Sequence, residues 1–533
     1  MTIKYIQTKD ILIMKKSFKK YILLPALALS AAAVAATAIA CGQQASSSSK
    51  VLDDLKANKD LLTTLSFTGD LEVVTGTNDK AALETWFKDN KSNTTPTLST
   101  TTKATRTAEL TKADVTVAAP TDTTVKVDVV AVAFDGTDSS KLNVLLKATK
   151  GDSSVHFVKQ ITGKEKNGTT GVSLGLSVGD PTNPRWNAAR DILNTAARNY
   201  GFSGSTTNIE GQAEQNSALE TALNNGAKGI LVSTVDADSS KPLVDAAKAK
   251  NVPLVAYDRL ITGSSDYDYY VTYDNERVGV MQGFSLIKGI YSATVNFDSA
   301  KSNADNIKAL VDYVKEHKFT SAKYIYLSAG AQEDNNSKIF FDGAMSVINA
   351  AKAEDTNLLF LNTNTTFADV ATPKWIGENA AKKFTPIWNN AGTEKQSNLV
   401  GILAPNDGVA NALATELSNI GGGNTKWQSV YITGQDGNTE SLESLRAKNS
   451  KIDMTIKKAD EPLSRAGVAI LTLLAAYPNA TKDQIHAWLK ISNPNDNFVI
   501  NTTSYKAQSK AITTILLSPT IVTQDNVATE FPK

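Results

Sequence analysis

The 533-residue sequence is poor in the residues that most often carry catalysis, with one cysteine and three histidines. A single cysteine excludes an internal disulfide. His156, His317 and His486 are far apart in the sequence, and none accompanies a candidate nucleophile in a known motif. There is no G-x-S-x-G elbow, no phosphate-binding loop and no cluster with metal-ligand spacing. We therefore expect no enzyme, no cofactor and no metal.

The sequence also lacks an excess of charge of either sign, since 55 lysines and arginines face 54 aspartates and glutamates. Nucleic-acid-binding domains carry clustered basic charge, so no nucleic-acid partner is expected. The length exceeds that of one domain, and the 41% hydrophobic content is enough to bury several cores. The chain is therefore expected to fold into more than one globular unit.

The first 50 residues have the pattern of a secretory signal, with either Met1 or Met14 as the first residue. Four lysines between residues 15 and 20 precede an apolar stretch, 21–40, which ends in Ala-Ile-Ala before Cys41. This arrangement resembles the lipobox of bacterial lipoproteins, in which the cysteine is acylated after cleavage. The resemblance implies a signal peptide at 1–40, a lipid on Cys41, a polar tether at 41–50, and a protein anchored to the outer side of the cell membrane.

Residues 51–165 are predicted to form a separate α+β module. Leucines at helical spacing near residue 55 and the stretch Ala81–Lys91 indicate helices, and a Thr/Ser-rich loop follows them. Leu71–Val74, Val115–Ala118, Val125–Phe134 and Leu142–Ala148 have the composition of strands. No constellation in this module indicates chemistry, so we interpret it as a spacer between the membrane and the rest of the chain.

After Gly171 the pattern changes to strands that alternate with amphipathic helices. Such alternation predicts parallel sheets covered by helices on both faces. The cycle restarts near residue 304, which indicates two such units, and a cleft between two units is a favoured ligand site.

Polar and aromatic side chains follow the predicted strands at their carboxyl ends, where α/β sheets bind ligands. They are Arg185 and Trp186, Asp258 and Arg259, Asp334 and Asn336, Asn406, Gln435 and Asp436, and Lys458. Asp and Asn also favour helix N-caps, which is the alternative interpretation for any one of them. Capping does not require Arg, Trp or Gln, so the recurrence of these residues favours a binding site.

Residues 171–527 resemble the periplasmic sugar-binding proteins of ABC transporters, and most of all the D-xylose-binding branch. The matching stretches are PRWNAARDI, VPLVAYDRLI, YYVTYDNERVG, GAQEDNNSK, PKWIGENA, APNDGVANAL, TGQDGN, DMTIKK and LLSPTIVTQDNV. The resemblance implies an α/β fold of two doubly wound lobes joined by a hinge, the type I periplasmic binding protein fold. The first lobe would comprise 170–285 and 460–492, and the second 286–459 and 493–533, with hinge crossings near 286–320, 457–462 and 492–511.

The resemblance also implies roles for residues at matching positions. Trp186 and Trp375 would stack on the two faces of a sugar ring. The sugar hydroxyls would be bound by Arg185, Asp258 and Arg259 of the first lobe, by Asp334, Asn336, Asn406 and Asp436 of the second, and by Lys458 at the hinge. Two departures bear on the identity of the sugar: the segment before Trp375 is longer and lacks a second tryptophan, and Lys457 replaces an aromatic residue.

The function implied is that of a lipid-anchored, monomeric binding protein that passes a monosaccharide, D-xylose or another pentose, to an ABC permease. One alternative is a structural or adhesive surface lipoprotein that retains the fold. Another is a glycoside hydrolase, because the sequence leaves open that Asp258 and Asp436 form a carboxylate pair across a scissile bond. A repressor of the same fold would need an N-terminal helix-turn-helix, and the lipobox occupies that place.

Overall fold

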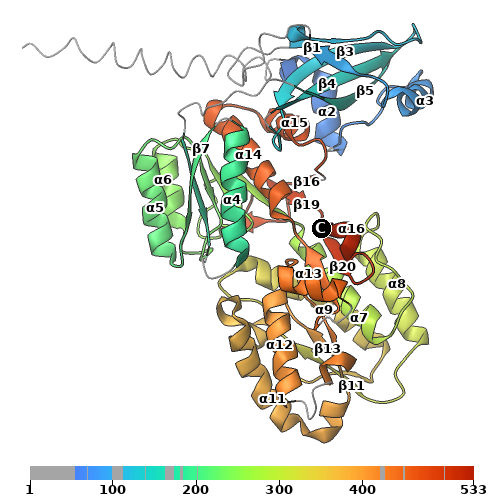
Figure 1. Ribbon diagram of the computed structural model, residues 1–533, viewed down its shortest axis with the longest axis vertical. Coiled ribbons are helices and arrows are strands. Elements are labelled where there is room, and N and C mark those ends of the chain that lie inside the picture. Colours follow the sequence, from blue (N-terminus) through green and yellow to red (C-terminus); the bar gives the residue numbers. More distant parts are fainter. Residues whose placement is uncertain are drawn as a thin grey trace, which may run out of the picture.

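The computed structural model of the chain describes residues 54–68, 70–98, 112–138, 140–162, 173–179, 184–200, 202–420, 426–447, 451–496 and 498–532. The predicted signal peptide, tether and Cys41 lie outside these residues. Figure 1 shows an N-terminal module above two α/β lobes. Because both lobes have sheets with helices on each face, the predicted two-lobed α/β fold is confirmed.

The first lobe is built on a seven-stranded sheet with the order β16-β19-β10-β9-β8-β6-β7. Only β16 is antiparallel to its neighbour. Apolar side chains of α4 and α14 cover one face of the sheet and those of α5 and α6 the other. The strands are β6 (Ser173–Val178), β7 (Ser203–Asn208), β8 (Ile230–Val232), β9 (Leu254–Tyr257), β10 (Tyr269–Tyr273), β16 (Phe498–Asn501) and β19 (Thr514–Leu517), and the helices are α4 (Pro184–Asn199), α5 (Gln212–Asn224), α6 (Lys241–Ala249), α14 (Asp460–Ala476) and α15 (Lys482–Ser492).

The second lobe has a parallel four-stranded sheet with the order β12-β11-β13-β14. Helices α7, α8 and α9 cover one face, and α11 and α12 the other. A separate antiparallel pair, β15 and β20, lies beside the hinge. The strands are β11 (Lys323–Leu327), β12 (Leu358–Phe360), β13 (Leu399–Leu403), β14 (Tyr431–Ile432), β15 (Met454–Lys457) and β20 (Thr520–Thr523), and the helices are α7 (Asn275–Ile290), α8 (Asn303–Glu316), α9 (Asn335–Glu354), α10 (Phe367–Val370), α11 (Gly377–Ser397), α12 (Asp407–Ile420), α13 (Thr439–Arg446) and α16 (Val527–Glu530).

The lobe boundaries differ from the predicted ones in two places. Strands β16 and β19 lie in the first sheet, so the stretch 493–517 does not belong to the second lobe. Helix α7 packs along α9 and therefore belongs to the second lobe, although its first residues were predicted in the first. The three crossings fall between β10 and α7, between β15 and α14, and between β19 and β20. Turn-forming residues around Asn493 led to a predicted crossing there, but in the structure two more strands of the first sheet, β16 and β19, follow them.

The N-terminal module has a three-stranded antiparallel sheet, β3-β4-β5. Residues 71–74 do not form the predicted strand, since only Thr75 makes an isolated bridge to Ser154. Part of the predicted loop forms a short strand instead. The elements are α2 (Lys59–Thr68), α3 (Lys80–Asn90), β1 (Pro96–Leu98), β2 (Val115–Val117), β3 (Lys126–Phe134), β4 (Lys141–Lys150) and β5 (Ser153–Thr162).

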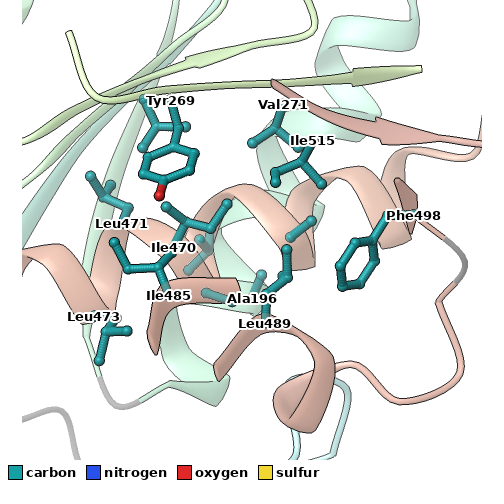
Figure 2. Packing of buried hydrophobic residues seen from close by; sticks show 14 of the residues in the cluster. Ala196, Tyr269, Val271, Ile470, Leu471, Leu473, Ile485, Leu489, Phe498 and Ile515 are labelled. Atoms are coloured by element: carbon teal, nitrogen blue, oxygen red, sulfur yellow. The ribbon is translucent and has the colours of Figure 1, made fainter. Parts of the chain in front are cut away.

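The module shares a hydrophobic core with the first lobe through α15. Leu61 of α2 and Leu145 of β4 belong to the same buried cluster as Ile485 and Leu489 of α15. Figure 2 shows those two α15 residues beside Ile470 of α14, under the sheet. The backbone NH of Gly136 also donates to the carbonyl of Ser492 over 3.2 Å. The module is therefore packed against the first lobe, which a freely held spacer would not be.

Candidate functional site

A cavity that is partly open to solvent lies between the two lobes. All ten residues that the sequence singled out for binding line it, namely Arg185, Trp186, Asp258, Arg259, Asp334, Asn336, Trp375, Asn406, Asp436 and Lys458. They come together because Arg185 and Trp186 begin α4 after β6, and most of the others follow strands β9, β11, β13, β14 and β15. Trp375 lies further along, in the short 3₁₀ turn Pro373–Trp375 after β12 and α10. Sequence reasoning thus found one contiguous set of side chains.

Two of these residues are also helix caps, as the alternative interpretation proposed. Asp334 accepts a hydrogen bond from the backbone NH of Asn336 at the start of α9. The Asn406 side chain accepts one from the NH of Val409 over 2.9 Å. Each cap uses only part of the side chain's capacity for hydrogen bonds, so capping and pocket lining coexist.

Every cation of the pocket faces a carboxylate. Arg185 makes a two-pronged pair with Asp258, at 2.7 and 3.3 Å, and reaches Asp460 at 3.1 Å. The Arg259 Nε lies 3.1 Å from Asp334. The Lys458 Nζ lies 3.2 Å from Asp436.

The positive side chains control the ionisation of the buried acids. Burial alone would raise the pKa of Asp258, but Arg185, Lys458 and Arg259 lower it to about 2. Burial raises the pKa of Asp334 in spite of Arg259, and that of Asp460 in spite of Arg185. Asp258 is therefore a fixed anion at neutral pH, with carboxylate oxygens that accept hydrogen bonds.

Three pocket residues have left-handed backbone conformations that side-chain-bearing residues seldom adopt. Asp258, Trp375 and Asp436 have φ values of 61°, 59° and 96°. Each such conformation costs about 1–3 kcal/mol and persists only where its surroundings hold it. The Asp258 carbonyl, for example, accepts hydrogen bonds from Tyr270, Thr272 and Asn336. Backbone strain at three positions of one cavity costs stability, so it indicates that the orientation of these side chains serves a function.

Aromatic rings contribute the apolar part of the lining. Trp186 is buried, with the guanidinium of Arg185 4.7 Å from its ring centroid and that of Arg259 5.4 Å away. Trp375 lies so close to Gly330 that a Cβ on this glycine would come within 2.2 Å of the ring. Its ring centroid is 6.5 Å from that of Phe340, in an edge-to-face arrangement.

Gln435 and Phe340 also line the cavity but are absent from the ten predicted binding residues, although Gln435 was noted at the end of its strand. Gln435 directly precedes Asp436 at the end of β14, so its position was the available signal. Phe340 gave none, because an aromatic residue within an apolar helix is normally a core residue. The side-chain oxygen of Gln435 and the indole nitrogen of Trp375 are both buried without a hydrogen-bond partner in the described structure.

The lobes contact each other across the cavity. The Arg259–Asp334 pair joins the first lobe to the second, and the Asn336 amide donates to the Asp258 carbonyl over 2.7 Å. At the surface, Lys374 lies 3.8 Å from Glu210. These contacts define a closed arrangement of the two lobes.

Two α/β lobes, three crossings and a polar cavity between the lobes define the class of two-lobed solute-binding proteins. The chain belongs to the periplasmic binding protein domain family, which it matches over residues 174–478. This membership places it among binding proteins and not among enzymes, as the sequence predicted.

The chain is also similar to individual proteins. The "46 kDa surface antigen" of Mesomycoplasma hyopneumoniae is 34% identical over 371 residues, which cover 67% of this chain and 86% of the relative. The "D-xylose-binding periplasmic protein" of Escherichia coli is 27% identical over 277 residues, 52% of this chain and 70% of the relative. A solved ABC transporter solute-binding protein from Clostridium phytofermentans, with bound β-D-glucose, superposes with a TM-score of 0.53 at 21% identity and covers 67% of this chain and 96% of its own.

Within the part of the chain that the structure describes, no group of three or more His, Cys, Asp or Glu side chains could hold a metal ion. Nor does any helix of that part have the length and apolar character needed to span a membrane.

Proposed function

We propose that the protein binds a neutral monosaccharide, D-xylose or another pentose, between its lobes and delivers it to an ABC permease. The observation that carries this proposal is the combination, in the cavity between the lobes, of planar Asp, Asn, Gln and Arg groups with Trp186, Trp375 and Phe340. Sugar hydroxyls both donate and accept hydrogen bonds, which matches the planar groups, and the C–H faces of the ring match flat aromatic side chains.

The charge pattern favours an uncharged ligand. Arg185, Arg259 and Lys458 each already face an aspartate, so no cation of the cavity is left to neutralise an acidic ligand. Hydroxyl groups can bridge such ion pairs without adding charge. The names of two relatives, a D-xylose-binding and a multiple sugar-binding periplasmic protein, support the same ligand class.

We further propose that the protein acts as a monomer on the outer side of the membrane and is held there by a lipid on Cys41. The lipobox-like stretch before Cys41 supports this anchor. Sugar would favour the closed arrangement because it contacts both lobes at once.

A screen of monosaccharides by thermal shift tests the proposal. A ligand that binds only the folded protein raises its melting temperature. We expect a shift with D-xylose or another pentose, and none with a sugar phosphate or a uronic acid. Absence of a shift with any of xylose, ribose, arabinose and glucose would overturn the proposal.

A second candidate is a surface adhesive or structural lipoprotein, favoured by the 34% identity to a surface antigen. Uptake of radiolabelled sugar by cells with and without the protein separates the two. The glycoside hydrolase is disfavoured, because the chain belongs to the periplasmic binding protein domain family.

A further inference from the structure

The segment Val527–Phe531, which we call the C-terminal clamp, packs behind the cavity without lining it. Figure 1 shows α16 beside β20 and near α13, at the level of the hinge. Val527 belongs to a small apolar cluster with Leu442 and Leu445 of α13 and Val522 of β20, and Phe531 packs against this cluster. The clamp is thereby held by apolar contacts on the second lobe.

The ring of Phe531 packs against the loop Gln435–Gly437, which carries two residues of the cavity. A Cβ on Gly437 would come within 2.8 Å of the Phe531 Cζ, and Gly437 has a φ of 69°. Gly437 directly follows Gln435 and Asp436, both of which line the cavity. The backbone there is strained, since Asp436 also has a left-handed conformation. Such a loop keeps its shape only when its neighbours fix it.

The clamp also binds the hinge strand. The Lys457 Nζ donates to the Glu530 carbonyl over 2.6 Å and lies 3.4 Å from the Glu530 carboxylate. The same Nζ lies 5.0 Å from the ring centroid of Phe531. Lys457 is followed by Lys458, which pairs with Asp436 in the cavity. The clamp thus contacts the chain neighbour of each partner in the Asp436–Lys458 ion pair, namely Gly437 and Lys457.

Backbone hydrogen bonds connect the two sides. The Asp436 NH donates to the Ile456 carbonyl over 3.0 Å, and the Gly437 NH donates to the Thr455 hydroxyl over 3.1 Å. These two bonds hold the loop against β15, and Phe531 covers the loop at Gly437. Removal of the ring would leave the strained loop free to move away from β15.

We propose that the C-terminal clamp positions Asp436 and Lys458 for the ligand, with Phe531 and Lys457 as positioning residues that never touch it. This inference rests on the proposed sugar-binding function for its effect on affinity. Its structural part, that the clamp fixes the Gln435–Gly437 loop, does not depend on the ligand.

The ligand-independent test is amide hydrogen exchange in the protein without sugar. Phe531→Ala should speed exchange at the Asp436 and Gly437 amides by about tenfold or more, because their hydrogen bonds would open locally. Lys457→Gln, which leaves the apolar cluster intact, should act in the same direction. The matched control is Phe319→Ala, which removes a partly buried ring that stacks on Tyr291 elsewhere in the second lobe. Unchanged exchange at both amides in Phe531→Ala and Lys457→Gln would overturn the clamp.

The ligand-dependent test is a double-mutant cycle titrated with D-xylose and D-glucose by calorimetry. Phe531→Ala should weaken binding by about tenfold in the otherwise unchanged protein and hardly at all when Asp436 is already replaced by Asn, because interacting residues are not additive. Phe531→Leu should restore part of the affinity.

If Phe531→Ala weakens sugar binding equally with Asp436 unchanged and with Asp436 replaced by Asn, Phe531 does not act through Asp436. That result would overturn the positioning role. If the unmutated protein binds neither sugar, the proposed function fails for these sugars, while hydrogen exchange still decides whether the clamp exists.

Discussion

Asp258 combines burial, charge and a strained backbone in one residue of the cavity. Asp258→Asn keeps the shape and tolerates the left-handed conformation, but removes the negative charge. Hydrogen bonds to a charged group contribute about 1.5–3 kcal/mol each, so we expect sugar affinity to fall by tenfold to several hundredfold. The cations that lower the pKa of Asp258 also lose their partner, so the melting temperature should fall as well, although Asp460 remains as a partner for Arg185. Titration calorimetry and thermal unfolding measure the two effects, and undiminished affinity would contradict the assignment of Asp258 to the site.

Asp407, at the start of α12, is a buried acid behind the cavity. Burial, together with the charge of Asp436, raises its pKa to about 8. One carboxylate oxygen accepts from the Asn438 NH, and the other has no hydrogen-bond partner in the described structure. The folded protein therefore binds a proton here that the unfolded chain releases above pH 4.

This proton makes stability depend on pH. Because the folded pKa is raised, the contribution of Asp407 to stability declines as pH increases from about 4 to about 8 and then levels off. The side chain in Asp407→Asn is neutral at every pH. The melting temperature of this variant, relative to that of the unmutated protein, should therefore rise over that range, by at least about 2 °C at pH 8. Thermal unfolding between pH 5 and 9 measures the gain, with the exposed Asp191→Asn as control. A difference independent of pH would show that Asp407 is ionised in the fold.

The residues of the cavity were largely predictable because carboxyl ends of parallel strands meet at one edge of a sheet. Their backbone conformations were not. Nothing in the sequence distinguishes Asp258 or Trp375 as left-handed, since non-glycine residues adopt this conformation only under tertiary constraint. Phe340 was missed for a related reason, because nothing in the sequence separates a ring of an apolar helix that lines the cavity from one that packs in the core.

At the scale of elements, α7 shows that helix packing determines which lobe a helix belongs to. The hydrophobic pattern of the sequence predicts the helix but not its lobe. Glycines 279 and 283 let this helix approach α9 so closely that a Cβ on either would collide with the α9 backbone. The spacing of these two glycines was visible in the sequence and indicates close helix packing, but it does not name the partner. The final strands were misplaced for another reason, since strand composition does not say which of two sheets a segment joins.

Helix α15 couples the N-terminal module to the first lobe, and its stability should depend on both. Leu145→Ala removes a fully buried side chain from the shared core, whereas Leu83→Ala removes one from the module's own core. Each should cost about 2–5 kcal/mol. Only Leu145→Ala should speed hydrogen exchange in α15, because only Leu145 faces the shared core. Equal protection of α15 in both variants would mean that the module and the lobe are energetically independent.

At the scale of the whole molecule, the proposed anchor determines where binding takes place. Cys41 lies outside the described residues, and it is the only cysteine of the sequence. Two acyl chains are needed for stable attachment to a membrane, and a lipobox cysteine receives them on a single residue. Any labelled lipid on a thiol of this protein would therefore report on Cys41 alone.

Cys41→Ser should abolish lipid attachment and shift the protein from the detergent-rich to the aqueous phase in a detergent phase separation. Metabolic labelling with a fatty-acid analogue should mark the unmutated protein and leave the variant unmarked. Sugar affinity serves as the control and should stay the same, because every residue of the cavity lies beyond residue 184. A variant that still partitions fully into the detergent-rich phase would show that an apolar segment retains the protein at the membrane. The stretch 21–40 would then be an uncleaved anchor, and the lipobox interpretation would be wrong.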